Sequence, residues 1–324
     1  MKFIKVLIIG VISFVGVNKI FGQQQAGFSL YNQFAGVYNP SAIPDEYTNN
    51  EHNFIFGLNA RTQWTELASA PRTQAISGEY ITNNSINSFN VLVGGYIMND
   101  KIGPISTTGA YFRAASILSD YDPTYGGFSA GLEFGAIQYR INTSTLAEKY
   151  PNDILTANKV NSSKPQIGLG VSYFNTFRKG VFKNTKINTG ISLIQIGFSD
   201  VKFQDELNEF GYAEFMHLYG YGKIRKSFGS QSLEFNTWLR YVTSAKVNAD
   251  FHLLFNINEI FSIEFGTNTS GIRHVGFGLN FIDLFGAGSE DMVHITYSYN
   301  PSSLTVGNVF GNTHEIGLKY SFEN

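Results

Sequence analysis

The sequence contains no cysteine and few charged residues. Its 324 residues include 8 Pro, and Asp, Glu, Lys and Arg make up 15%, whereas a soluble domain carries about 25% charged residues. The absence of cysteine excludes disulfides, thiol catalysis, Cys-based zinc sites and a cysteine lipid anchor. The net charge of −2, without a basic cluster, argues against nucleic-acid binding.

Long hydrophobic segments are missing after the N-terminus. No later apolar run approaches the roughly 20 residues of a transmembrane helix. At the start, Lys2 and Lys5 precede a short apolar run from Val6 to Val17. This pattern predicts a signal peptide over 1–22, cleaved between Gly22 and Gln23, and therefore an exported protein. An anchoring helix is the alternative, but no stop-transfer pattern follows.

What the chain has in abundance is glycine, aromatics and alternation of apolar with polar residues. It contains 33 Gly, 29 Phe and 18 Tyr. In "VNADFHLLFN", Phe251 and Leu253 share a face opposite Asp250 and His252. Such a period of two is typical of strands with two chemically different faces.

The alternating segments predict an all-β, transmembrane outer-membrane β-barrel of about 14 antiparallel strands. Most are longer than the usual globular strand of about 5–6 residues and suit a tilted membrane crossing. A soluble β-sandwich is the structural alternative. The predicted strands are 54–62, 72–81, 88–98, 104–117, 127–141, 165–177, 184–196, 213–227, 231–242, 246–256, 260–268, 272–283, 291–300 and 312–322.

Connection lengths support this strand count. The longest gaps, 142–164, 197–212 and 301–311, follow the fifth, seventh and thirteenth strands. With both chain ends periplasmic, these are external loops, which are the longer ones in such barrels. The barrel is thus predicted over 51–324. Residues 23–50 carry turn signals and are either a plug inside the lumen or a periplasmic tail.

No motif for catalysis, a cofactor or a metal is present. There is no GxSxG, HExxH or complete dinucleotide fingerprint. His252, His274 and His294 all lie on inward positions, but on three different strands, which favours solvated side chains over metal ligands. An inward ion-pair network is expected from charged residues of the same face. Its candidate members are Glu133, Glu234, Arg240, Glu264 and Lys319.

Two N-terminal stretches, "FSLYNQFAGVYNPSAIP" (28–44) and "RTQWTELASAPRTQAISGEY" (61–80), carry a family resemblance. With "VLVGGYIMNDKIGPISTTGAYFRAA" and "GGFSAGLEFGAIQYRI", they resemble the PorP/SprF family of type IX secretion system membrane proteins of Bacteroidota. The "TELAS" segment and the long 142–164 connection depart from the family pattern. The residues that match the family motifs are Asn39, Pro40, Arg61, Gln63, Trp64, Pro71, Thr73, Ser77, Asn99, Asp100, Gly103 and Pro104.

This resemblance implies a non-enzymatic outer-membrane component of type IX secretion. Its expected partners are outer-membrane lipid, motor or ring components of the secretion system, and a secreted, adhesin-like surface protein bound through its C-terminal region and linked to gliding. Trp64, Pro71 and Arg72, in the first external connection, are the candidate partner contacts. A loop folded into the barrel mouth is the structural alternative for them. A diffusion channel or hydrophobic-substrate transporter is the alternative function, and an outer-membrane hydrolase is disfavoured because no triad motif occurs.

Overall fold

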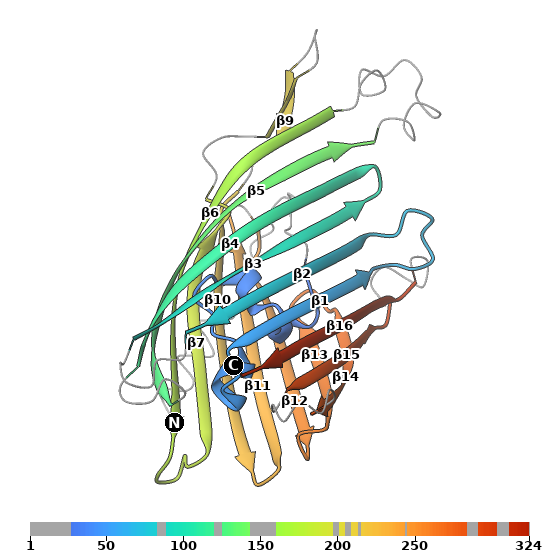
Figure 1. The fold of residues 1–324 in the computed structure, drawn as a ribbon. Coiled ribbons are helices and arrows are strands. Elements are labelled where there is room, and N and C mark those ends of the chain that lie inside the picture. The colour runs from blue at the N-terminus through green and yellow to red at the C-terminus, as the bar shows by residue number, and fades with distance from the viewer. Residues whose placement is uncertain are drawn as a thin grey trace, which may run out of the picture.

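In the computed structural model, fourteen antiparallel strands of the described chain form a closed barrel (Figure 1). The structure describes residues 27–82, 89–119, 125–142, 160–196, 201–204, 209–212, 215–243, 245–283, 291–302 and 311–323. The barrel strands are β1 (Phe54–Thr62), β2 (Arg72–Ile81), β3 (Phe89–Ile102), β4 (Ile105–Ser119), β5 (Gly126–Ile141), β6 (Val160–Phe177), β7 (Thr185–Ile194), β10 (His217–Phe228), β11 (Gln231–Val242), β12 (Asn248–Ile257), β13 (Phe261–Asn268), β14 (Arg273–Ile282), β15 (Met292–Asn300) and β16 (Thr313–Phe322).

The two faces of the wall differ as the alternation predicts. On β12, Phe251 is 39% exposed on the outside, while its neighbour His252 is 4% exposed inside. On β1, Phe56 and Leu58 point outward and Asn59 inward. An apolar outer face suits hydrocarbon, and a closed sheet leaves no strand edge unpaired within it. Among the described helices, none is long and apolar enough to cross a membrane.

Pairing of β1 with β16 closes the barrel. Their register sets Phe54 opposite Phe322 and Thr62 opposite His314. The rings of Phe54 and Phe322 stack with centroids 5.0 Å apart, and Tyr80 of β2 packs on Phe54 at 4.6 Å. Aromatic rings at this end of the wall match the interfacial girdle of outer-membrane barrels.

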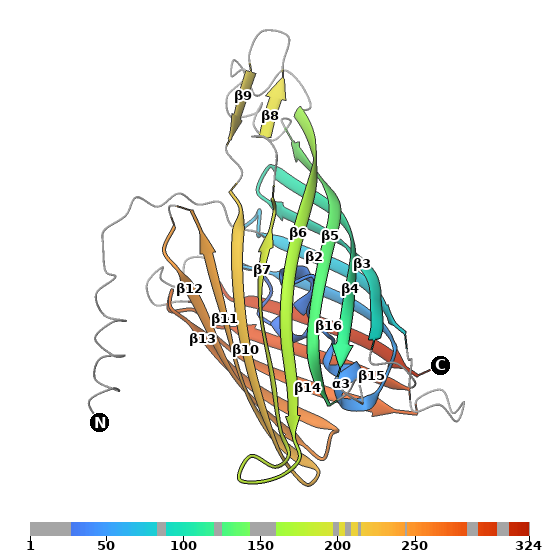
Figure 2. The same ribbon diagram turned by 90° about the vertical axis from the view of Figure 1, so that its left-hand side faces the viewer.

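The two ends of the barrel differ in their connections. One end carries the connection 63–71 and the two-stranded sheet of β8 (Val201–Gln204) and β9 (Glu209–Tyr212), which projects beyond the wall in Figures 1 and 2. By the rule that external loops are longer than periplasmic turns, this end is external. The opposite end, with short turns such as 229–230, is periplasmic.

Residues 27–50, here called the N-terminal segment, lie inside the barrel wall (Figure 1). The segment contains a 3-10 turn η1 (Tyr31–Gln33) and the short helices α2 (Ala35–Tyr38) and α3 (Asp45–Asn50). Its apolar side chains form the larger of the two described hydrophobic clusters together with inward aromatics of the wall. That cluster comprises Phe28, Tyr31, Phe34, Val37 and Tyr38 with Ala75, Tyr96, Met98, Tyr111, Ile194, Tyr219, Tyr221 and Trp238.

The predicted fold class and the count of fourteen barrel strands are confirmed. Three boundaries were wrong by four or five residues: β3 ends at Ile102 rather than at 98, β6 begins at Val160 rather than at 165, and β10 begins at His217 rather than at 213. The predicted loop 197–212 contains β8 and β9. The predicted signal peptide and its cleavage point at Gly22 and Gln23 lie outside the described residues.

Candidate functional site: the barrel interior and its vestibule

An Asn-Pro-Ser turn fixes the middle of the N-terminal segment. The side-chain oxygen of Asn39 accepts hydrogen bonds from the amide (2.9 Å) and the hydroxyl (2.7 Å) of Ser41. The turn rests on wall positions that lack side chains. A Cβ atom at Gly131 would lie 2.5 Å from the Pro40 carbonyl, and one at Gly170 would lie 2.0 Å from Asn39 Oδ1. These glycines therefore provide the space that the turn occupies.

A buried arginine of the wall holds the same turn. Arg113 on β4 is 1% exposed and donates hydrogen bonds to the carbonyl oxygens of Pro40 (3.0 Å) and Ala42 (2.9 Å). Its other terminal nitrogen lies 2.7 Å from Glu79 Oε1 on β2. A buried guanidinium needs such partners, because leaving it unpaired is costly. Arg113 thus joins the segment to two strands at once.

The start of the segment is bound by a second charged pair. Glu315 on β16 is fully buried and accepts hydrogen bonds from the backbone amides of Ser29 (2.6 Å) and Leu30 (3.3 Å). Arg61 Nε on the adjacent β1 lies 3.6 Å from Glu315. The Arg61 guanidinium also donates to the Gly27 carbonyl. Charge-assisted hydrogen bonds of this kind are stronger than neutral ones.

Lysines of the wall hold α3 at the periplasmic end. Lys319 Nζ lies 2.9 Å from Glu46, and Lys223 pairs with Asp45. Lys186 donates to Asn49 Oδ1 at 2.8 Å. Burial alone would raise the pKa of Asp45, but the ammonium group of Lys223 outweighs it and holds that pKa below its ordinary value of 3.8. Asp45 is therefore ionised at neutral pH.

Above the segment, at the external end, lies a cavity of about 780 Å³, here called the vestibule. Its floor includes Phe28, Ser29 and Tyr31 of the N-terminal segment. Its walls carry both charge signs, with Arg61 and Asp100 among the lining residues. The volume lies within the range of about 300–1,000 Å³ that ligand pockets show.

The family described as type IX secretion system membrane protein PorP/SprF matches residues 20–320 of the sequence. The chain belongs to the PorP/SprF family. This is a family of secretion-system membrane proteins, and it is not a known enzyme family. Membership, together with the closed barrel, places this protein in the outer membrane.

Solved structures similar to this PorP/SprF chain are outer-membrane barrels. The CymD monoaromatic hydrocarbon channel gives a TM-score of 0.52 at 10% identity and covers 91% of this chain and 98% of its own. A mutant of the TodX monoaromatic hydrocarbon channel gives 0.51 at 11% identity, covering 89% and 93%. A Pseudomonas aeruginosa FadL homologue gives 0.51 at 9%, covering 88% and 92%. At these identities the likeness shows the fold alone. No match was found among curated proteins.

Eight of the twelve residues that were expected to match family motifs lie in the N-terminal segment or line the vestibule. Asn39 and Pro40 form the buried turn, as described above. The other motif residues that line the vestibule are Arg61, Gln63, Trp64, Pro71, Thr73 and Asp100. Thr73 and Asp100 face each other across β2 and β3, and the threonine hydroxyl donates to Asp100 Oδ1 at 2.6 Å.

The remaining motif residues shape the wall. Ser77 lies across from Gly57, where an added Cβ would approach the serine hydroxyl to 2.7 Å. Asn99 donates to Thr108 across β3 and β4 at 2.7 Å. Gly103 adopts a φ of 58° in the tight turn before Pro104, a conformation that favours glycine. These residues lie at strand pairs and turns rather than in the vestibule.

The three candidate partner contacts occupy different environments. Trp64 is 44% exposed with a φ of 54° and lines the vestibule. Pro71 also lines it but is buried, and its carbonyl accepts a hydrogen bond from the amide of Gln63 at 2.9 Å. Arg72 is exposed and is not among the vestibule-lining residues. The two ends of the connection 63–71 therefore border the vestibule, with Trp64 at its rim.

Sequence reasoning missed Arg113 and Glu315, because their partners lie far away along the chain. Their inward position on alternating strands was the only available signal. Of the expected charged network, Lys319 pairs with Glu46, and Glu234 lies 3.9 Å from Lys223. Glu133 accepts a hydrogen bond from Tyr96 at 3.0 Å. The inward charges thus bind the N-terminal segment and neighbouring wall residues.

Proposed function

We propose that this barrel is a non-enzymatic anchor in type IX secretion. The vestibule receives a short segment, the C-terminal region, of a secreted, adhesin-like surface protein. The periplasmic end, formed by α3 and the short turns, contacts components of the secretion and gliding machinery. Family membership and the vestibule at the external end support this proposal.

The observation that carries the proposal is a cavity that opens to one side. Its floor is the N-terminal segment, which is hydrogen-bonded to the barrel wall. Phe28 and Tyr31 under the vestibule belong to the same segment that Arg113 and Glu315 hold below it. A volume of about 780 Å³ accommodates a short stretch of chain and excludes a folded domain. A captured segment would therefore enter from outside and stop at the floor.

Trp64, Pro71 and Arg72 are the proposed contacts of this partner. Trp64 offers a large exposed ring at the rim, and such rings dominate binding energy in protein interfaces. Pro71 lies beside it in the cavity wall. Arg72 follows on the outer surface, where it would meet the part of the partner outside the vestibule.

The test is to introduce a photo-crosslinking residue at Trp64 and to purify the barrel from outer membranes in mild detergent. Mass spectrometry should map crosslinks to the C-terminal region of a secreted surface protein. A synthetic peptide of that region should then compete with them. In parallel, Trp64→Ala should reduce recovery of that protein, while Phe112→Ala, at an exposed aromatic on the outer face of β4, should not. Recovery of the barrel alone, with no crosslinked surface protein, would refute the proposal.

A second candidate function is a diffusion channel, because similar folds include proteins named as monoaromatic hydrocarbon channels. The N-terminal segment argues against this alternative, because it lies inside the barrel and is hydrogen-bonded to the wall. A channel should conduct ions or pass apolar molecules in planar bilayers and liposomes. The anchor should be silent in both assays, so conductance separates the two functions.

A further inference from the structure

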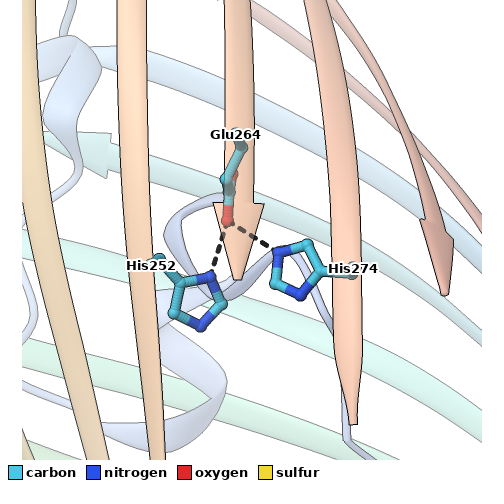
Figure 3. Close-up of side chains that lie close together, drawn as sticks. All are labelled: His252, Glu264 and His274. Atoms are coloured by element: carbon cyan, nitrogen blue, oxygen red, sulfur yellow. Dashed lines mark hydrogen bonds and ion pairs between the residues drawn. The ribbon is translucent and has the colours of Figure 1, made fainter. Parts of the chain in front are cut away.

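Three buried side chains on adjacent strands converge in the wall of the vestibule (Figure 3). Glu264 Oε1 on β13 lies 2.6 Å from His252 Nδ1 on β12 and 3.2 Å from His274 Nε2 on β14. One ligand atom from each residue lies within 4.8 Å of the others. Both histidines line the vestibule. His294 lies apart from this group and contacts Asn280 instead.

The backbone is shaped to let the two imidazoles approach the carboxylate. Gly266 stands opposite both His252 and His274 in the strand register, between the two histidines. A Cβ atom at Gly266 would lie 1.9 Å from Cε1 of His274. The His274 ring therefore lies across bare backbone. Only a residue without a side chain leaves it free to reach Glu264.

Hydrogen bonding within the group does not satisfy all of its polar atoms. His252 is 4% exposed, and its Nε2 atom is buried with no hydrogen-bond partner. Its ring packs nearly perpendicular to the aromatic ring of Tyr31, with centroids 5.4 Å apart. A buried nitrogen without a partner in an otherwise bonded site can serve as a ligand to water or an ion. Rotation of the ring can present either nitrogen to an ion.

We propose that His252, Glu264 and His274 bind a divalent transition-metal ion such as Zn²⁺. Two imidazoles and one carboxylate are ligands that Zn²⁺ accepts in protein sites, and three protein ligands leave a fourth position open. Because both histidines line the vestibule, that position faces it. The ion replaces the protons that the imidazoles share with Glu264, so binding releases protons. The site is independent of the cargo proposed above.

The first experiment uses the full barrel in detergent, with any affinity tag removed and metal stripped by a chelator. Calorimetric titration should give one Zn²⁺ per chain, and Co²⁺ should give the absorption bands of a low-symmetry site. His252→Gln and His274→Gln should each weaken Zn²⁺ binding by more than the roughly 10–100-fold that loss of an outer-shell partner costs. His294→Gln is the matched control and should bind as the wild type does.

A second variant tests the geometry while keeping every ligand. Gly266→Ala should displace the His274 ring and weaken Zn²⁺ binding, and heat-modified migration on gels reports whether each variant is folded. A wild-type barrel that binds no stoichiometric Zn²⁺ would overturn the proposal. So would folded His252→Gln and Gly266→Ala variants that bind Zn²⁺ like the wild type, because the triad would then be a hydrogen-bonded cluster alone.

Discussion

Replacing Gly131 with alanine should displace the Asn-Pro-Ser turn from its position against the barrel wall. The added Cβ would lie 2.5 Å from both the carbonyl carbon and oxygen of Pro40, and 2.6 Å from the amide nitrogen of Ser41. All three atoms are backbone, so no flexible side chain can give way. The turn must move by about 0.9 Å to reach the 3.4 Å at which ordinary contact begins.

The expected energetic cost follows from overpacking. Adding one methyl group to a well-packed interior costs about 1–3 kcal/mol. If that cost falls on docking of the N-terminal segment, the undocked population rises by roughly 5–150-fold. The strands themselves should remain paired, because the substitution leaves the backbone of Gly131 in register with Ala115 of β4 and Gly170 of β6.

Cysteine labelling measures this population directly, because the chain has no cysteine of its own. Ala42→Cys places a thiol at a position that is 2% exposed, so maleimide reacts only when the segment leaves its seat. In this background, Gly131→Ala should speed labelling by roughly 5–150-fold. Gly222→Ala is the control, since its Cβ would meet nothing closer than 3.6 Å. Equal labelling rates in the two variants would refute the reasoning.

Three further predictions concern Arg113, the Asp45–Lys223 pair and the outer face of the barrel. Arg113→Met should speed labelling of Ala42→Cys more than Gly131→Ala does, because losing one partner of a buried pair costs about 3–5 kcal/mol; an unchanged rate would contradict this role. The Asp45–Lys223 pair should stabilise docking above pH 3.8 and be lost as the pH falls below it. Bilayer conductance should therefore appear on acidification, and Asp45→Asn should reduce this pH dependence without abolishing it, because Glu46 and Glu315 also hold the segment through ion pairs. Finally, Ile97→Lys on the outer face should destabilise the barrel by about 2–4 kcal/mol in urea unfolding from vesicles, and a neutral effect would contradict lipid contact.

Alternation predicted the barrel wall because strand faces follow a local rule. Phe251 and His252 lie on opposite faces because successive side chains of a strand point in opposite directions. The same rule holds along every strand of the barrel. The predicted strand boundaries were wrong where the alternation of apolar and polar residues was weak. The first residues of β6, from Val160 to Lys164, are polar apart from Val160, so the sequence resembled a loop until Pro165.

The interior could not be predicted in the same way, because its contacts join distant parts of the chain. Ser29 and Glu315, which form a hydrogen bond, are 286 positions apart in the sequence. Pro40 and Arg113, which form another, are 73 positions apart. Nothing local in residues 23–50 distinguishes a tail from an inserted segment. The family motifs identified Arg61 as important, but its bond to the Gly27 carbonyl is visible only in the structure.

One pattern in the sequence does carry information about the interior. In a lumen filled with water, inward positions gain nothing from glycine, which weakens a strand. Yet Gly131, Gly170 and Gly190 occupy inward positions on neighbouring strands, and at each an added Cβ would collide with Asn39 or Pro40. Facing inward glycines on paired strands therefore indicate an inserted chain rather than an open pore. By this argument the Asn-Pro-Ser motif and the glycines of β5, β6 and β7 are one feature, and substituting either should release the same segment.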